Sequence, residues 1–330
     1  MKTYLKIALL IIVLACLGFF IRATDWSAVS AAVREVGFNF LILLFITTVS
    51  AWLGVMGWRY CLPKEAAVVS GWKLFWIRQI GENIAILNPT SVIGGEAMKM
   101  YMLRDTGVKQ RQVLHSILLS RAIMIISQIF LLLIAGIWFL SLTVHEFSWP
   151  AFNGWWMVAL PALVIGAMLL LRSRWFRNVA KSLFQRFHLL ERYRKIRLFV
   201  SELWQELLAF YRDNRRAMLL SFLFCSLHWI VGSLEFYFIL LFLGVKTTVA
   251  KALLVDMGVI VFKSAGGFVP GQLGIEEYGN KVMLSIIGIA GSTIWITASI
   301  LRRARQLCWI ILGLLMYFLF YRKGAFFVQS

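Results

Sequence analysis

The chain has 330 residues, of which 61% are hydrophobic and 15% are charged, and its mean hydropathy is +0.80. Soluble domains carry roughly 25% charged residues, whereas several apolar runs here approach the length of about 20 residues that a helix needs to cross a bilayer. This composition excludes an ordinary soluble enzyme and predicts an all-α polytopic membrane protein, with one integral membrane domain over residues 1–330. The 34 Lys and Arg against 15 Asp and Glu are explained by basic cytoplasmic loops, so no nucleic-acid partner is expected.

The first apolar run covers Leu5–Ile21 and follows Lys2, with Lys6 near its start. The stretch that ends at Cys16 resembles a lipoprotein signal, but the apolar residues continue beyond it and no small-residue cleavage site follows. We therefore expect an uncleaved first helix, and the two lysines place its N-terminus in the cytoplasm.

Five further apolar runs are long enough to span a bilayer as helices. They are Phe38–Trp58, Val113–Leu142, Trp155–Leu171, Ala217–Leu243 and Thr293–Phe320. With six full spans, the basic residues between them fall on one side, which predicts cytoplasmic N- and C-termini in a bacterial inner membrane. These residues are Arg59, Lys64, Lys99, Arg104, Lys109, Arg111, the basic residues of the loop 172–216, Arg322 and Lys323.

The loop over residues 172–216 is rich in arginine and contains the segment LFVSELWQELLAFY. Its pattern predicts an amphipathic helix that lies along the cytoplasmic surface and rests on anionic headgroups. In that reading the loop fixes the topology. The alternative is a regulatory or docking site, for example for a lipid-biosynthesis enzyme.

Two semi-apolar segments, Gly71–Leu87 and Ala252–Val269, are poor candidates for simple spans because each carries charge. The charged residues are Arg78, Glu82, Asp256 and Lys263. A charged side chain costs roughly 2.5–3.5 kcal/mol at the centre of a spanning helix. We expect two re-entrant helical hairpins instead, since irregular backbone is tolerated at membrane depth when it is buried in protein or faces a wet cavity.

A glycine-rich turn follows each segment, NPTSVIGGEAMK in the first case and VPGQLGIEEYGN in the second. In both, a glutamate stands seven residues after a proline; these glutamates are Glu96 and Glu277. The predicted hairpin tips contain Pro89, Gly94, Gly95, Pro270 and Gly274.

The order of span, hairpin and span occurs twice, at about residues 38–142 and 217–320. The loop charges orient the two units oppositely, which predicts an inverted repeat with a binding site near the bilayer midplane. A rival topology of seven to eight spans makes Lys281–Ala290 a further span and places the C-terminus outside. Six spans are preferred because they keep Arg322 and Lys323 in the cytoplasm.

Arginines lie inside two predicted spans, and they are the residues that indicate chemistry. Arg121 follows Glu96 by 25 residues, as Arg302 follows Glu277. The planar fork of arginine binds two phosphate oxygens together, and a carboxylate neutralises it in an empty site. We predict a lipid-headgroup site, preferably for a phosphate-bearing headgroup, formed by Glu96, Arg121, Glu276, Glu277 and Arg302. The neighbouring Arg303 and Arg305 either join it or extend to the headgroups.

Patterns for catalysis and metal binding are absent from the sequence. The four histidines are scattered without an HExxH, Walker or GxSxG motif, and the four cysteines form no CxxC pair. His228 and Glu235 share a face of the fifth span, where a polar contact between helices is preferred over an embedded acid–base pair. We therefore expect no enzyme activity, catalytic residue, cofactor or metal.

The stretches NPTSVIGGEAMKMYMLRDTG and GGFVPGQLGIEEYG resemble the lysylphosphatidylglycerol synthase transmembrane region, also called the flippase-like membrane family. The resemblance covers nearly the whole chain and implies a protein that moves lipids between leaflets. The soluble aminoacyl-transferase domain of the synthases has no counterpart in these residues, so aminoacylation is not expected. Stand-alone members are similar to proteins linked to hopanoid, glycolipid and polyprenyl-phosphate pathways. The motif positions are Pro89, Gly94, Gly95, Glu96, Arg121, Pro270, Gly274, Glu276 and Glu277.

Residues and resemblance together predict a flippase for an anionic or polyprenyl-phosphate-type lipid, or for a hopanoid or glycolipid. The alternative is a membrane scaffold or accessory protein of a lipid or glycan biosynthesis pathway, which would act through residues 172–216. A third possibility, an intramembrane lipid-modifying enzyme, is disfavoured by the scattered histidines.

Overall fold

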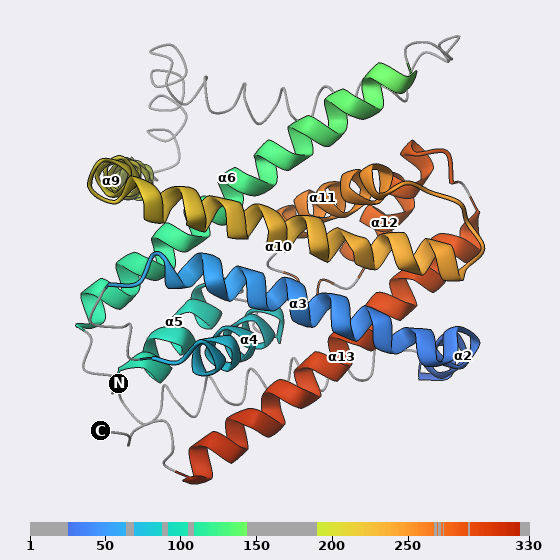
Figure 1. The fold of residues 1–330 in the computed structure, drawn as a ribbon, viewed down its shortest axis with the longest axis horizontal. Coiled ribbons are helices and arrows are strands. Elements are labelled where there is room, and N and C mark those ends of the chain that lie inside the picture. Colours follow the sequence, from blue (N-terminus) through green and yellow to red (C-terminus); the bar gives the residue numbers. More distant parts are fainter. Residues whose placement is uncertain are drawn as a thin grey trace.

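The computed structural model describes residues 26–63, 69–87, 92–104, 109–143, 190–266, 274–289 and 291–323, together with Val269 and Gln272. Within these ranges the regular structure is entirely helical, as predicted, and contains no strand (Figure 1). The helices are α2 (Trp26–Val36), η1 (Gly37–Asn39), α3 (Phe40–Arg59), α4 (Gly71–Leu87), α5 (Val92–Leu103), α6 (Gln110–Thr143), α9 (Leu190–Asp213), α10 (Arg215–Phe242), α11 (Val249–Ala265), α12 (Ile275–Ile286) and α13 (Ser292–Lys323).

Four of the six predicted spans fold as long helices, α3, α6, α10 and α13. By length and composition, Trp26–Arg59, Gln110–Ser141 and Arg215–Phe242 are able to cross a membrane. These helices, together with the family assignment given below, make the chain a multi-pass membrane protein. The other two predicted spans, Leu5–Ile21 and Trp155–Leu171, lie outside the described residues.

Each charged semi-apolar segment begins a pair of short antiparallel helices, α4 with α5 and α11 with α12. The helices of the first pair approach closely because glycines face each other: a Cβ on Gly95 would lie 2.4 Å from the carbonyl oxygen of Gly81. In the second pair, a Cβ on Gly258 would meet Met283, and one on Gly266 would meet Ile275. Removing the side chain at such positions lets two helix backbones pack tightly.

The second arms, α5 and α12, have 12 residues each. At 1.5 Å per residue such a helix extends about 18 Å, well short of the hydrocarbon thickness of about 30 Å. Lys281 to Ile286 form the last turns of α12. The segment of the rival topology, Lys281–Ala290, therefore begins inside α12, and the number of spans stays a prediction.

The two halves of the bundle have the same helix order, α3 to α6 and α10 to α13, and α4 and α11 have 17 residues each. The helices α3 and α10 run antiparallel along each other (Figure 1). The hydroxyl of Ser50 donates to the carbonyl oxygen of His228 at 2.9 Å, and Ser221 donates to the carbonyl oxygen of Gly57 at 2.9 Å. The long last helix of each half packs on the hairpin of the other half, α6 on α11 and α13 on α4.

The hairpins enter the bundle from opposite ends. The start of α4 lies beside the C-terminal end of α3, where Gly71 faces Trp52, Met56 and Arg59. The start of α11 follows the C-terminal end of α10. Because α3 and α10 are antiparallel, these two ends lie on opposite sides of the bundle (Figure 1).

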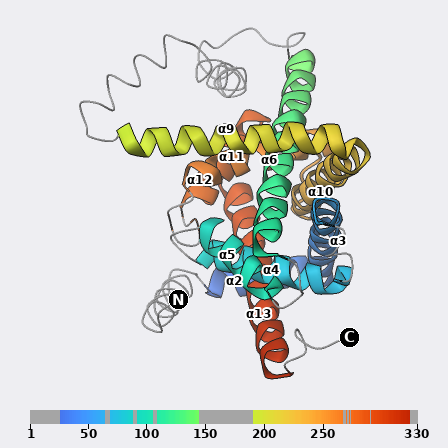
Figure 2. The ribbon, with the colours of Figure 1, turned by 90° about the vertical axis from the view of Figure 1, so that its left-hand side faces the viewer.

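The segment predicted as an amphipathic helix is confirmed as α9, which lies across the ends of α6 and α10 (Figure 2). Leu207 is buried, and Leu203 and Phe210 pack on the same core. Trp204 and Leu208 are exposed on the outer side. One apolar side of α9 thus holds the bundle, while a second remains uncovered by the described residues.

Candidate functional site

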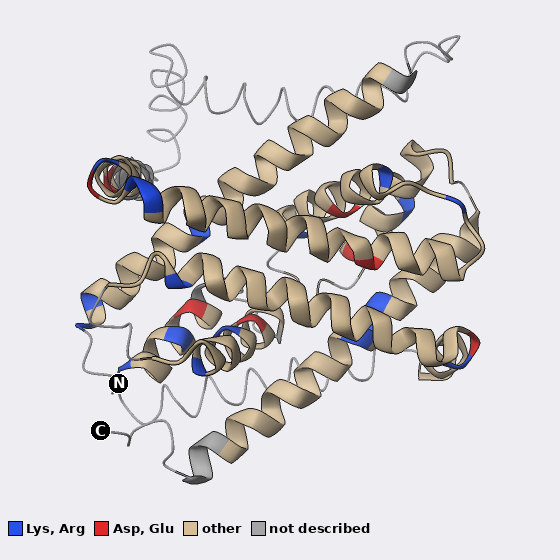
Figure 3. Ribbon diagram, in the orientation of Figure 1, with Lys and Arg blue, Asp and Glu red and all other residues tan. Residues whose placement is uncertain are grey.

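Among the described residues, the charged positions inside the bundle gather in two places, one at each helix pair (Figure 3). We call the group on α4, α5 and α6 the first ionic cluster; it comprises Arg78, Glu82, Glu96, Lys99 and Arg121. The group on α10 to α13 is the second ionic cluster; it comprises Glu235, Asp256, Lys263, Glu276, Glu277, Arg302, Arg303 and Arg305.

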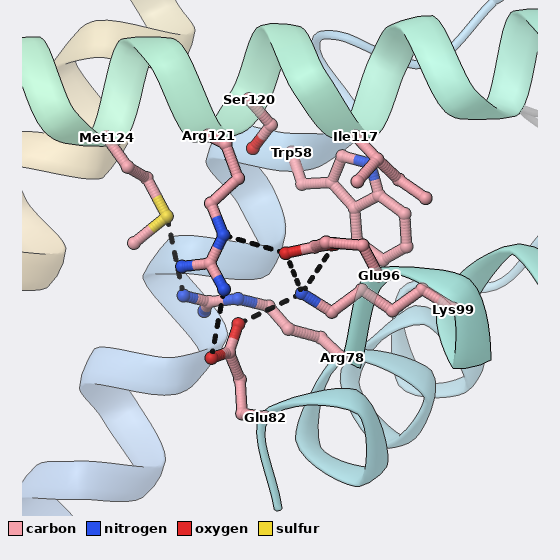
Figure 4. A pocket seen from close by; sticks show the side chains of 9 residues that line it. All are labelled: Trp58, Arg78, Glu82, Glu96, Lys99, Ile117, Ser120, Arg121 and Met124. Atoms are coloured by element: carbon pink, nitrogen blue, oxygen red, sulfur yellow. Dashed lines mark hydrogen bonds and ion pairs between the residues drawn. The ribbon is translucent and has the colours of Figure 1, made fainter. Parts of the chain in front are cut away.

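In the first ionic cluster, Glu96 lies between two cations (Figure 4). Arg121 donates from Nε to Glu96 Oε1 at 2.7 Å, and Lys99 Nζ lies 3.2 Å from Glu96 Oε2. Glu82 contacts the same two cations from the other hairpin arm, at 2.9 Å to Lys99 and 3.5 Å to Arg121. These four charges therefore form one network rather than separate pairs, and Arg78 lies beside it.

Helical spacing and the close packing of glycines build this network. Glu96 and Lys99 stand three residues apart and Arg78 and Glu82 four apart, so each pair lies on one face of its helix. The contact at Gly95 then brings the two faces together.

Arg78 is a buried cation that extends from α4 to the middle of α3. Its guanidinium donates to the carbonyl oxygen of Ala51 at 2.9 Å and contacts the sulfur of Met124 at 3.7 Å. A Cβ on Gly54 would lie 2.0 Å from Nη1, so the glycine provides the space that this group occupies. Ala51 and Gly54 lie well inside the 20-residue helix α3, which places Arg78 far from both ends of that helix.

These residues line a pocket that is also bordered by Trp58, Ile117, Ser120 and Met124 (Figure 4). The side chains of Glu82 and Arg121 are 31% and 29% exposed, whereas those of Lys99 and Glu96 are 7% and 10% exposed. The pocket therefore opens beside Glu82 and Arg121. The free space is about 20 Å³, enough for a water molecule, so a larger group enters only if side chains move.

The second ionic cluster is centred on Arg302, which is 6% exposed. Arg302 donates to Asp256 at 2.9 Å and lies 3.1 Å from Glu276 and 3.9 Å from Glu235. Its guanidinium also stacks on the ring of Phe236, 4.3 Å from the centroid. Further ion pairs join Arg305 to Glu235, Lys263 to Glu276 and Arg303 to Glu277.

The structure brings together the residues that the sequence pointed to, with one shift in register. Arg121 contacts Glu96, but Arg302 contacts Glu276, while Glu277 contacts Arg303. Glu277 also accepts a hydrogen bond of 2.7 Å from the N–H of Gly274 at the start of α12. That start is a turn for which glycine is suited, because Gly274 has a φ of 80°.

Of the two alternatives for Arg303 and Arg305, the structure shows the first, since both contact carboxylates inside the bundle. Two expectations about individual residues need correction. Gly94 and Gly95 belong to α5 itself and not to the turn before it, since Gly95 is needed for close packing. Lys99 is 5% exposed within the first ionic cluster, so it is no loop residue. Pro89 and Pro270 lie outside the described residues.

Six members of the clusters are not among the predicted site residues: Arg78, Glu82, Lys99, Glu235, Asp256 and Lys263. The signal is present in the sequence, because ionisable residues at membrane depth mark functional sites by default. It applies to the charges of the semi-apolar segments as well as to those of the long helices.

His228 and Cys61 lie outside the two ionic clusters. His228 Nδ1 lies 2.7 Å from the carbonyl oxygen of Ser50, which matches the preferred contact between helices, while Glu235 contacts Arg302 and Arg305. Burial raises the pKa of the Cys61 thiol to about 12, so it remains protonated near neutral pH. Among the described residues, no group of three or more His, Cys, Asp or Glu is suited to hold a metal.

A comparison with protein families finds a match over residues 5–314, to the family described as the lysylphosphatidylglycerol synthase TM region. The match includes both hairpins and every residue of the two ionic clusters. No curated protein and no solved structure matches the chain.

Proposed function

The chain belongs to the lysylphosphatidylglycerol synthase TM-region family, and from this premise we propose that it is a lipid translocase of the bacterial inner membrane. The family itself consists of membrane proteins in lipid-related processes. The proposed substrate is an anionic or polyprenyl-phosphate-type lipid, whose headgroup binds at the first ionic cluster.

The observation that carries the proposal is the contact between Glu96 and Arg121. Arginine is suited to phosphate, and Glu96 neutralises it at 2.7 Å when no anion is bound. The pocket opens on the side of Arg121 and Glu82, so a headgroup meets the more exposed end of the network first. Entry of a phosphate beside Arg121 would add negative charge to a pocket in which three cations face two carboxylates.

The fold supports movement of a headgroup through protein while the acyl chains remain in lipid. The long helix α6 presents Ile125, Phe130, Ile134 and Ile137 to the outside as large exposed apolar residues, which suits contact with acyl chains. We propose that the two helix pairs are re-entrant hairpins of an inverted repeat, because they enter from opposite ends and have matching lengths. In the proposed orientation, both termini and α9 lie on the cytoplasmic side.

Lipid exchange in reconstituted vesicles tests this function. The protein is inserted into phosphatidylcholine vesicles that contain a trace of tail-labelled phosphatidylglycerol, and the label is reduced chemically from outside. With active protein, label from the inner leaflet also becomes reducible. We expect Glu96→Gln and Arg121→Ala to abolish this additional signal without loss of folded protein.

A matched control is Arg111→Ala, which removes an exposed arginine from the start of the same helix. It should exchange lipid like the unmodified chain. Full exchange by both Glu96→Gln and Arg121→Ala would refute the assignment of that pair.

A scaffold function is the second candidate, and the uncovered side of α9 favours it. Trp204 and Leu208 are 57% and 41% exposed on the side away from the bundle. If α9 recruits a biosynthetic enzyme, Trp204→Ser with Leu208→Ser will abolish function in cells while the hairpin glutamates remain dispensable. If the protein is a translocase, substitution of the hairpin glutamates will abolish function in cells, and Trp204→Ser with Leu208→Ser will leave it intact.

A further inference from the structure

We propose that Arg78 sets the charge preference of the pocket, and that the headgroup it selects carries one negative charge, as a phosphodiester does. This inference rests on the proposed translocase function and narrows its substrate class. The shared chemistry occurs in glycerophospholipids such as phosphatidylglycerol and in polyprenyl phosphodiesters.

The pocket carries an excess of positive charge. Three cations line it, Arg78, Lys99 and Arg121, but only two carboxylates, Glu82 and Glu96. Both carboxylates contact Lys99 and Arg121. One positive charge is therefore left without a carboxylate among the described residues, and it belongs to Arg78.

The excess charge lies largely away from water and among neutral groups. The partners of Arg78 are the carbonyl oxygen of Ala51 and the sulfur of Met124, both neutral, and the residue is 7% exposed. An unbalanced charge away from water is costly, and a bound anion lowers that cost. One bound negative charge makes the lined pocket neutral overall. A ligand with two negative charges would leave the pocket and ligand together with one excess negative charge.

The second ionic cluster differs from the first because its charges are balanced. There, four cations face four carboxylates, and each cation contacts at least one carboxylate. Arg78 is the eighth residue of α4. The eighth residue of α11 is Asp256, a carboxylate that contacts Arg302. The two clusters are thus similar in place but different in charge, and only the first calls for an anion.

Direct binding to the full-length protein in a neutral detergent tests the inference. The probes are tail-labelled phosphatidylglycerol, with one negative charge, phosphatidic acid at pH 8, with nearly two, and phosphatidylcholine, with none overall. A labelled polyprenyl phosphodiester distinguishes the two lipid sources. We expect phosphatidylglycerol or the polyprenyl phosphodiester to bind about tenfold or more tightly than the other two, since one charged contact is worth about that factor.

Three variants assign the preference to Arg78. Arg78→Gln should abolish it, and Arg78→Lys, which keeps the charge, should retain it. Arg111→Gln removes one charge at an exposed site of α6 and should leave the preference unchanged. Thermal unfolding of each variant shows that the binding data come from folded protein, and Gly54→Ala, which displaces the guanidinium, provides a second route to the same loss.

The charge preference and the translocase function are tested by different measurements. Equal binding of all probes, or an unaltered preference in folded Arg78→Gln, overturns the inference, whereas the translocase function stands if vesicle exchange persists. Absence of vesicle exchange for every probe overturns the translocase function, whereas the binding preference is still decided in detergent. A preference for phosphatidic acid also overturns the inference, because it would show a site with more than one unbalanced positive charge.

Discussion

The side-chain amide of Asn83 donates a hydrogen bond of 2.7 Å to the carbonyl oxygen of Trp309, which joins the first hairpin to the last long helix. Asn83 follows Glu82 of the first ionic cluster, and Trp309 lies one turn beyond Arg305 of the second. The contact therefore connects the two clusters through α13. Gly313 makes room for it, because a Cβ there would lie 2.1 Å from the amide nitrogen of Asn83.

Gly313→Ala should destabilise the protein by about 1–3 kcal/mol, the usual cost of overpacking a tight contact. The added methyl group displaces the amide of Asn83 and breaks the hydrogen bond to Trp309. Thermal unfolding in detergent measures the loss, and lipid exchange is expected to decrease with it.

A double-mutant cycle checks the cause of this loss. In Asn83→Ala the amide is absent, so adding Gly313→Ala should cost little more than Asn83→Ala alone. Additive losses in the cycle would show that Gly313 matters for another reason, such as backbone geometry.

The close approach of α4 and α5 gives the second prediction. In Gly95→Ala the new methyl group would lie 2.4 Å from the backbone carbonyl of Gly81, which cannot move without separating the hairpin arms. We expect a loss of about 2–3 kcal/mol and, because Glu96 shifts away from Arg121, a loss of lipid exchange. Circular-dichroism melting and vesicle exchange measure the two effects.

The control is Gly136→Ala on α6, where the added Cβ meets no atom within 4 Å. It should be neutral or slightly stabilising, since alanine favours helix by up to about 1 kcal/mol over glycine. Equal losses for the two substitutions would contradict the role assigned to close packing.

The second ionic cluster yields a prediction about stability. Arg302→Gln leaves Asp256 and Glu276 without their central partner, and breaking a buried ion pair typically costs about 3–5 kcal/mol. Arg302→Lys should cost less, because it keeps the charge but loses the planar contact with Phe236. A chemical or thermal unfolding series orders the three proteins, and an Arg302→Gln protein as stable as the unmodified chain would show that the cluster does not hold the helices together.

The coarse architecture was predictable because its signals are local. Apolar runs predicted α3, α6, α10 and α13 to within a few residues, and the two charged semi-apolar segments correspond to α4 and α11, the first helices of the two helix pairs. The lengths of α5 and α12 could not be predicted in the same way. They depend on where the chain turns after its prolines, and no periodic pattern of apolar residues marks their ends.

The composition of the site was only partly predictable. The pairing of Glu96 with Arg121 followed from a repeated spacing of 25 residues. In the other half, the sequence left Glu276 and Glu277 open as partners of the arginines. The structure pairs Arg302 with Glu276, whereas Glu277 caps α12. Arg78 could not be placed, since its position depends on the absence of a side chain at Gly54, which is distant in sequence.

The last prediction concerns the sides from which the two halves are reached. Arg111 lies at the start of α6 and Lys246 just before α11; both are exposed. In the proposed inverted repeat, Lys246→Cys, in a chain whose native cysteines are replaced, should react in intact cells with a membrane-impermeant maleimide. Arg111→Cys should react only after the membrane is permeabilised, because basic loops stay in the cytoplasm. Labelling of both cysteines from the same side would contradict the inverted orientation, and with it the entry of the hairpins from opposite faces of the membrane.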